Sequence, residues 1–155
     1  MKVLFVCTGN ICRSPTAEAV ARTLAAEQGL AGHLTFESYH VGDPPDPRAI
    51  ARGRVRGYDI TPLRARRVRA ADYADFDLIL AMDATHYRAL VRQCPPAYRE
   101  KIRMFLAEGE AATGPDVPDP YYGDEHDFDD VLDLCERGLA PLLTTWRESF
   151  RTPKT

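Results

Sequence analysis

Short apolar runs alternate with longer stretches of mixed polarity along the chain. The runs from Val3 to Cys7 and from Leu78 to Met82 are continuous and apolar, which is typical of strands buried on both faces of a parallel sheet. Two further runs, Leu34 to Tyr39 and Ile102 to Leu106, predict two more strands.

Helices are predicted between these strands. The residue pattern indicates helices over Pro15 to Gln28, Pro47 to Gly57 and Thr85 to Arg92. Ser14 is a good N-cap for the first helix, and Gly29 suits its end. Strands that alternate with helices predict an α/β domain with a parallel sheet.

The last third of the chain predicts a loop followed by a long helix. Residues 108–124 are rich in Gly, Pro and Asp, which indicates a loop. From Phe128 to Phe150 apolar residues recur at helical spacing, and Pro141 predicts an interruption or a kink. The 155 residues are one domain's length, so we assign residues 1–150 to a single domain and residues 151–155 to a C-terminal tail.

Composition and charge narrow the class of protein. The chain is 45% hydrophobic with a formal net charge of −3, which argues against disorder and against a nucleic-acid partner. No apolar stretch approaches the roughly 18 residues of a membrane span, and no export signal is visible. We therefore expect a cytoplasmic protein with reduced thiols and no membrane partner.

The charges are distributed unevenly. The segment from Arg48 to Arg69 holds eight arginines and one acid, whereas the segment from Asp116 to Glu136 holds nine acids and only His126 as a basic group. We interpret the two segments as solvated faces that partly attract each other.

The loop after the first predicted strand carries the candidate chemistry. It lacks both the Gly-Lys-Ser/Thr ending and the Gly-x-Gly-x-x-Gly pattern of nucleotide-binding loops. Gly9 and Asn10 tolerate the backbone conformations that let N–H groups point inward and bind an anion, and the following helix adds positive potential. Arg13 can hold two oxygens of a phosphate with its planar fork.

Cys7 starts this loop and is the candidate nucleophile. Inward N–H groups, the helix dipole and Arg13 predict a lowered pKa for the Cys7 thiol, and a thiolate is a good nucleophile. The Ser14 hydroxyl can donate to the sulfur. Cys12 either packs or captures oxidised Cys7 in a disulfide, which would make the protein redox-sensitive. No second Cys or His pair stands at ligand spacing, so we expect no metal.

A thiolate that displaces an ester oxygen from phosphorus needs a separate proton donor. Asp119 is the best candidate, because prolines on both sides restrict its backbone; Asp116 and Asp124 are alternatives. Tyr121 and Tyr122 follow directly and could form an aromatic wall for an aryl leaving group.

These residues resemble the low-molecular-weight protein tyrosine phosphatases. The resemblance runs from Val3 to about Leu143, and its specific parts are Val3 to Glu18, Phe76 to Asp83 and Asp119 to Gly123. It implies a four-stranded parallel twisted sheet with helices on both faces and a phosphate loop after the first strand. It further implies that the Asp-x-Arg segment at residues 46–48 is structural.

The resemblance also implies the roles of the site residues. Cys7 is the nucleophile, Arg13 the phosphate and transition-state ligand, and Asp119 the general acid and then base, with no cofactor or metal. The implied substrate-binding residues are Thr8, Gly9, Asn10, Ile11, Cys12, Ser14, Tyr39, Tyr121 and Tyr122.

Three positions bear on the substrate. A related branch that acts on phosphoarginine carries Thr where this chain has Ile11, so a bulky aliphatic there favours phosphotyrosine. About five residues that many members have before Tyr39 are missing here, and Leu63 stands about where some members have a His that supports Asn10.

The resulting prediction is a cysteine-dependent protein tyrosine phosphatase that acts through a phosphocysteine. Its expected partners are phosphotyrosine proteins, among them a tyrosine kinase, and we expect a monomer or a weak dimer. Two alternatives remain open: an arsenate reductase of the same fold, which Cys94 and Cys135 are too far apart in sequence to favour, and a phosphopeptide-binding module without turnover.

Overall fold

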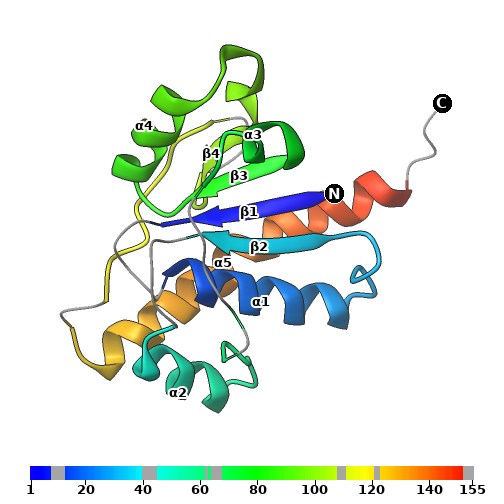
Figure 1. Ribbon diagram of the computed structural model, residues 1–155. Coiled ribbons are helices and arrows are strands. Elements are labelled where there is room, and N and C mark those ends of the chain that lie inside the picture. Colours follow the sequence, from blue (N-terminus) through cyan, green and yellow to red (C-terminus); the bar gives the residue numbers. More distant parts are fainter. Residues whose placement is uncertain are drawn as a thin grey trace.

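The computed structural model describes residues 1–7, 13–39, 45–61, 63, 68–107, 111–120 and 123–151, except for the side chains of residues 38 and 39. Four parallel strands form one sheet in the order β2-β1-β3-β4 (Figure 1). The strands are β1 (Lys2–Val6), β2 (Thr35–Tyr39), β3 (Leu78–Ala81) and β4 (Ile102–Met104). The expected parallel α/β fold is confirmed.

The helices lie on both faces of the sheet. Figure 1 shows α1 (Arg13–Glu27), α2 (Pro47–Val55) and α5 (Glu125–Arg151) on one side. The opposite side carries α3 (Asp72–Asp75) and α4 (Ala84–Gln93), and the 3₁₀ helix η1 (Pro96–Lys101) leads into β4. Neither α3 nor η1 was predicted, because both are short and lack an apolar period of their own.

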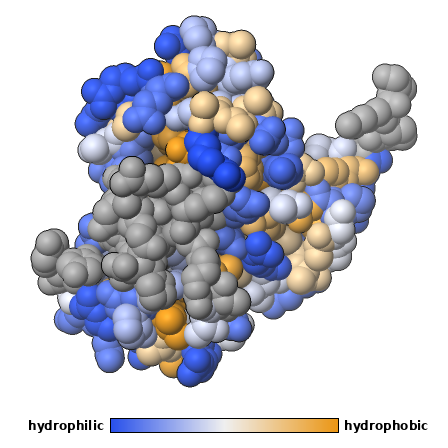
Figure 2. All heavy atoms as spheres, in the orientation of Figure 1, coloured by the Kyte–Doolittle hydropathy of each residue, from blue (hydrophilic) through white to orange (hydrophobic). Residues whose placement is uncertain are grey.

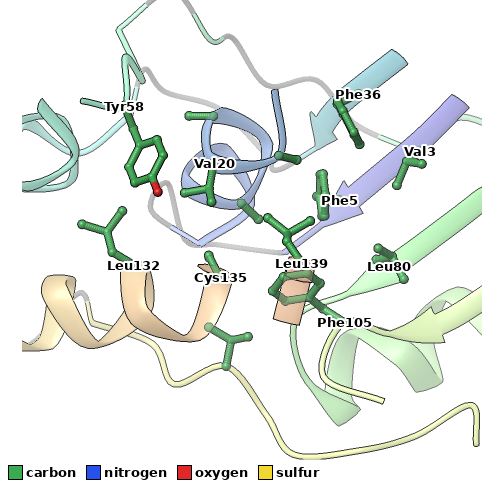
Figure 3. Close-up of a cluster of buried hydrophobic side chains, with 14 of the residues drawn as sticks. Val3, Phe5, Val20, Phe36, Tyr58, Leu80, Phe105, Leu132, Cys135 and Leu139 are labelled. Atoms are coloured by element: carbon green, nitrogen blue, oxygen red, sulfur yellow. The ribbon is translucent and has the colours of Figure 1, made fainter. Parts of the chain in front are cut away.

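Alternate side chains of β1 enter two separate cores. Phe5 joins the larger core under α1 and α5, where its ring stacks on Phe36 with centroids 6.0 Å apart (Figure 3). Leu4 and Val6 join the smaller core on the α4 side. This alternation explains why the β1 run is apolar without interruption.

Helix α5 runs through Pro141 without the interruption that was one of the two expected outcomes, and the other, a kink, stays a prediction. A proline removes one backbone N–H and therefore weakens a helix at that point. Leu139 and Leu143 lie on either side of Pro141, and both are fully buried in the larger core. We attribute the continuity of α5 to this buried face, which holds both halves of the helix against the sheet.

The charged segments meet between α2 and α5, as the sequence predicts. Arg52 bonds Asp129 at 2.9 Å, and Arg56 lies 2.7 Å from Asp133 and 3.4 Å from Glu136. In Figure 2 the surface around α2 shows both hydrophilic and hydrophobic atoms. The two segments therefore neutralise each other in part. In the described part of the chain no helix is long and apolar enough to span a membrane.

The larger core predicts a contrast between two neighbouring leucines of α5. Leu139 is fully buried, whereas Leu142 is only partly buried against the same core. We expect Leu139→Ala to lower the free energy of unfolding by about 3 kcal/mol, and the matched Leu142→Ala to cost less than about half of that. Urea unfolding measures both values; equal losses would contradict this placement of α5.

Candidate active site

The site lies where the strands end. Because all four strands are parallel, their carboxyl ends share one edge of the sheet, which is where ligands bind in open α/β folds. Val6 of β1 is in register with Tyr39 of β2 and with Ala81 of β3. Cys7 and Asp83, which follow two of these strands, therefore arrive at the same edge.

The Cys7 sulfur is buried against the start of α1. Cys7 is 1% exposed, and its Sγ lies 3.0 Å from the Oγ of Ser14. The sequence predicts Ser14 as the N-cap of this helix, but α1 begins at Arg13 and Ser14 lies fully buried within it. The hydroxyl of Ser14 contacts the sulfur, which fits its second expected role.

The electrostatic surroundings of Cys7 correct one expectation. Burial, the largest influence, raises the pKa of the Cys7 thiol above its ordinary value. Hydrogen bonds from Ser14 and the charge of Arg13 lower this pKa, and the charge of Asp119 raises it. The net direction is upward, opposite to the lowered pKa that local sequence predicts, because the cost of burying a thiolate depends on the whole fold.

Two hydrogen bonds hold one nitrogen of the Arg13 guanidinium. Its Nη1 donates to Oδ2 of Asp83 at 2.9 Å and to the carbonyl of Val117 at 3.0 Å. The residue is 4% exposed, and its Nε is buried without a hydrogen-bond partner in the described part of the chain. A buried N–H donor without a partner is uncommon, and an oxyanion bound beside Cys7 would satisfy it.

Asp83 holds Arg13 and also caps α4. Its Oδ1 accepts from the His86 N–H at 2.8 Å while Oδ2 accepts from Arg13. Burial works against the charged form of Asp83, but these hydrogen bonds and the nearby positive charge hold the pKa of Asp83 below its ordinary value. The sequence predicted Asp83 only as part of a motif, and its contact with Arg13 was not predicted. Its position directly after a buried strand was the available signal.

The three candidate acids differ in their surroundings. Asp116 accepts from the Ala84 N–H at 2.9 Å, and Asp124 accepts from the His126 N–H at 2.9 Å, so both stabilise helix starts. Asp119 is exposed, and its charge acts on Cys7. The N–H of Val117 donates to the Met82 carbonyl at 2.8 Å, which ties the Asp119 segment to the end of β3.

Comparison with known proteins identifies the family. Residues 2–152 match the model of the low molecular weight phosphotyrosine protein phosphatases. A low molecular weight protein-tyrosine-phosphatase of Streptomyces coelicolor is 40% identical over 157 residues, which cover 95% of this chain and 94% of the relative. The chain belongs to the low molecular weight phosphotyrosine protein phosphatase family.

Solved structures agree with this assignment. A protein tyrosine phosphatase from Entamoeba histolytica, crystallised with Hepes in the active site, superposes with a TM-score of 0.86 at 36% identity and covers 96% of this chain and 98% of its own. The arginine phosphatase YwlE, in a variant with a phosphorylated active-site serine, superposes with a TM-score of 0.83 at 26% identity, covering 95% and 96%. The expected enzyme class, a protein tyrosine phosphatase, is confirmed.

Part of the expected phosphatase site lies outside the described residues. Tyr39 ends β2, but its side chain is not described. Leu63 packs against the larger core. In the described part of the chain no cluster of three or more His, Cys, Asp or Glu could hold a metal. The sequence-predicted residues outside the described ranges are Thr8, Gly9, Asn10, Ile11, Cys12, Tyr121 and Tyr122, so the Cys7–Cys12 disulfide stays a prediction.

The contact of Arg13 with Asp83 predicts a coupled effect on the stability of this phosphatase. Asp83→Asn keeps a residue that caps helices well but leaves the buried Arg13 charge without its partner, so we expect a loss of about 3 kcal/mol in the free energy of unfolding. The double variant Arg13→Met with Asp83→Asn should lose less than Asp83→Asn alone. Urea unfolding of Asp83→Asn, Arg13→Met and the double variant measures the coupling, and additive losses would contradict it.

Proposed function

We propose that this phosphatase hydrolyses phosphotyrosine and related aryl phosphate monoesters through a phosphocysteine on Cys7. One observation carries the proposal. The buried Cys7 sulfur at the end of β1 lies 3.0 Å from the Ser14 hydroxyl, and the charges of Arg13 and Asp119 both act on the pKa of its thiol. A nucleophile, a cation for phosphate and an acid are the three groups that this reaction needs.

In the first step the Cys7 thiolate attacks phosphorus. The sulfur–phosphorus bond forms, the bond from phosphorus to the tyrosyl oxygen breaks, and Asp119 gives its proton to the leaving phenolate. Arg13 stabilises the negative charge on the phosphoryl oxygens, for which its unpartnered Nε is available. The residues Thr8, Gly9, Asn10, Ile11 and Cys12 complete the proposed phosphate-binding loop.

In the second step water releases the phosphate. Asp119, now a carboxylate, takes a proton from the water whose oxygen attacks phosphorus. The sulfur–phosphorus bond breaks, inorganic phosphate leaves, and Cys7 departs as a thiolate. The Ser14 hydroxyl stabilises this departing anion.

The charges of Cys7 and Asp119 are linked in the direction that this reaction needs. The negative charge of Asp119 raises the pKa of Cys7, so protonation of Asp119 favours the thiolate. The reactive form differs from one with a neutral thiol and a charged Asp119 only by the transfer of one proton.

The comparisons support a covalent phosphoenzyme on this fold. The solved arginine phosphatase variant carries its phosphoryl group on an active-site serine. Our preference for phosphotyrosine over phosphoarginine rests on Ile11, together with Tyr39, Tyr121 and Tyr122 as aromatic walls. A tyrosine kinase must supply such substrates. We place the enzyme in the cytoplasm, where thiols stay reduced, as a monomer or weak dimer.

The arrangement of the other cysteines disfavours arsenate reduction. That reaction passes a disulfide from Cys7 through further cysteines. Cys94 lies in the smaller core on the opposite face of the sheet from Cys7. Cys135 is fully buried in the larger core, and burial raises the pKa of its thiol strongly. Cys94 is therefore separated from Cys7 by the sheet, and the Cys135 thiol resists the ionisation that disulfide exchange needs.

Turnover of aryl phosphates by three proteins tests the proposal. We expect no turnover by Cys7→Ser, because its hydroxyl is a far weaker nucleophile than a thiolate. We expect Asp119→Asn to lower kcat/KM about 10²-fold with poorly acidic phenols and much less with acidic phenols, which leave without a proton. Steady-state kinetics with a series of substituted phenyl phosphates measures both effects.

Mass spectrometry of the quenched reaction tests the intermediate directly. We expect a phosphoryl group on Cys7 in the wild type. Similar rates for all three proteins would contradict the mechanism. Binding of phosphotyrosine peptide without release of phosphate would establish a binding module instead. Thiol-dependent turnover of arsenate without phosphatase activity would establish the reductase.

A further inference from the structure

The segment that carries Asp119, residues 116–124, is held by hydrogen bonds on both sides of Asp119. On the amino side, Val117 is fully buried; its N–H donates to Met82, and its carbonyl accepts from Arg13 at 3.0 Å. On the carboxyl side, the carbonyl of Gly123 accepts from Nη1 of Arg48 at 3.1 Å. The hydrogen bonds of Val117 belong to the site already described, whereas the hydrogen bond to Gly123 comes from α2.

Arg48 is itself held in a fixed orientation. Its Nε and Nη2 donate to the two carboxylate oxygens of Asp46 at 3.2 and 3.0 Å, and its guanidinium lies 4.6 Å from the ring centroid of Phe128. Asp46 is 6% exposed and caps α2 by accepting from the Arg48 N–H. Two guanidinium nitrogens of Arg48 thus bind Asp46, and the third, Nη1, binds the Gly123 carbonyl.

Residues at the start of α5 also restrict the position of Gly123. Its N–H donates to the carbonyl of Pro120 at 2.9 Å, and a Cβ at this position would overlap the carboxylate of Asp127. The Asp127 carboxylate accepts from the N–H of Asp124. The carbonyl that Arg48 binds is thus fixed in direction, and it lies four residues beyond Asp119 on a chain restrained by Pro120.

The next arginine of α2 offers a natural comparison. Arg52 lies one turn further along the helix and makes a two-pronged contact with Asp129 of α5, with both nitrogens 2.9 Å from an oxygen. Arg52 therefore joins α2 to α5, and among the described residues it has no hydrogen bond or ion pair with residues 116–120 or 123–124. Loss of the Arg52 side chain should weaken the α2–α5 contact without changing the position of Asp119.

We propose that Arg48 is a positioning residue for the acid of this phosphatase: by holding the Gly123 carbonyl, it keeps Asp119 over the leaving-group side of Cys7. This inference rests on the proposed role of Asp119. Arg48 does not touch the reacting atoms. Its effect reaches the chemistry through the placement of one carboxyl group, and catalysis is sensitive to displacements of about 1 Å.

A dependence on the leaving group distinguishes this role from a structural one. In Arg48→Met we expect kcat/KM to fall about tenfold with the least acidic phenol of a phenyl phosphate series and to stay near the wild-type value with the most acidic phenol. Inhibition by inorganic phosphate should not change, because Arg13 is untouched. Arg52→Met, the matched control, should keep the wild-type dependence on phenol acidity.

A double variant tests whether Arg48 acts through Asp119. In the Asp119→Asn background, Arg48→Met should cause no further loss of kcat/KM with any phenol. A further loss there, an unchanged leaving-group dependence in Arg48→Met, or an equal loss across the whole series would overturn the proposal. If Asp119→Asn itself leaves the dependence unchanged, the proposed function fails, and the inference fails with it.

Urea unfolding of each variant shows whether it is folded under assay conditions. Arg48→Lys is the second variant, because it keeps the positive charge near Phe128 but loses the fork that binds Asp46 and Gly123 together. We expect this variant to show a leaving-group dependence between those of the wild type and Asp119→Asn. A wild-type dependence in a folded Arg48→Lys would overturn the proposal even if Arg48→Met does not fold.

Discussion

Burial of the Cys7 sulfur is the constraint on which the rest of the site depends. Cys7, which is 1% exposed at the end of a central strand, is protected from solvent, but its thiolate is disfavoured for the same reason. Ser14 and Arg13 work against this cost, and Asp119 adds to it. The reactivity of the nucleophile is therefore a balance among neighbours rather than a property of one cysteine.

A continuous line of hydrogen bonds places those neighbours. The carbonyl of Val6 accepts from the Met82 N–H at 3.1 Å, the carbonyl of Met82 accepts from Val117, and the carbonyl of Val117 accepts from Arg13. This line links the strand before Cys7, the segment that carries Asp119, and the cation that binds phosphate. The parallel sheet makes the line possible, because it ends β1 and β3 at the same edge.

Local sequence was sufficient for much of the fold, and it named the candidate residues for the chemistry, whose roles stay proposals. The uninterrupted apolar runs predicted β1 and β3, and the spacing of Cys7 and Arg13 around a strand-to-helix loop predicted the site. The contacts of Asp83 and Val117 with Arg13 could not be predicted in this way, because residues about 70 and 104 positions apart meet only through the sheet topology.

Two expectations failed, and the interruption of the last helix, one of two outcomes expected there, did not occur. Pro141 does not interrupt α5, because buried leucines hold the helix on both sides. Ser14 lies inside α1 and not at its cap, and the pKa of Cys7 is raised instead of lowered. In each case tertiary burial outweighs a local preference, and burial is set by parts of the chain that lie far away in sequence.

The titration of Cys7 tests the central claim most directly. The alkylation rate of the Cys7 peptide, followed by mass spectrometry from low to high pH, gives the midpoint at which the thiolate forms in the wild type, Ser14→Ala and Asp119→Asn. The charge balance predicts a higher midpoint for Ser14→Ala, which loses a hydrogen bond to the sulfur, and a lower midpoint for Asp119→Asn, which loses a negative charge. Midpoints that do not move, or that move in the opposite directions, would contradict the account.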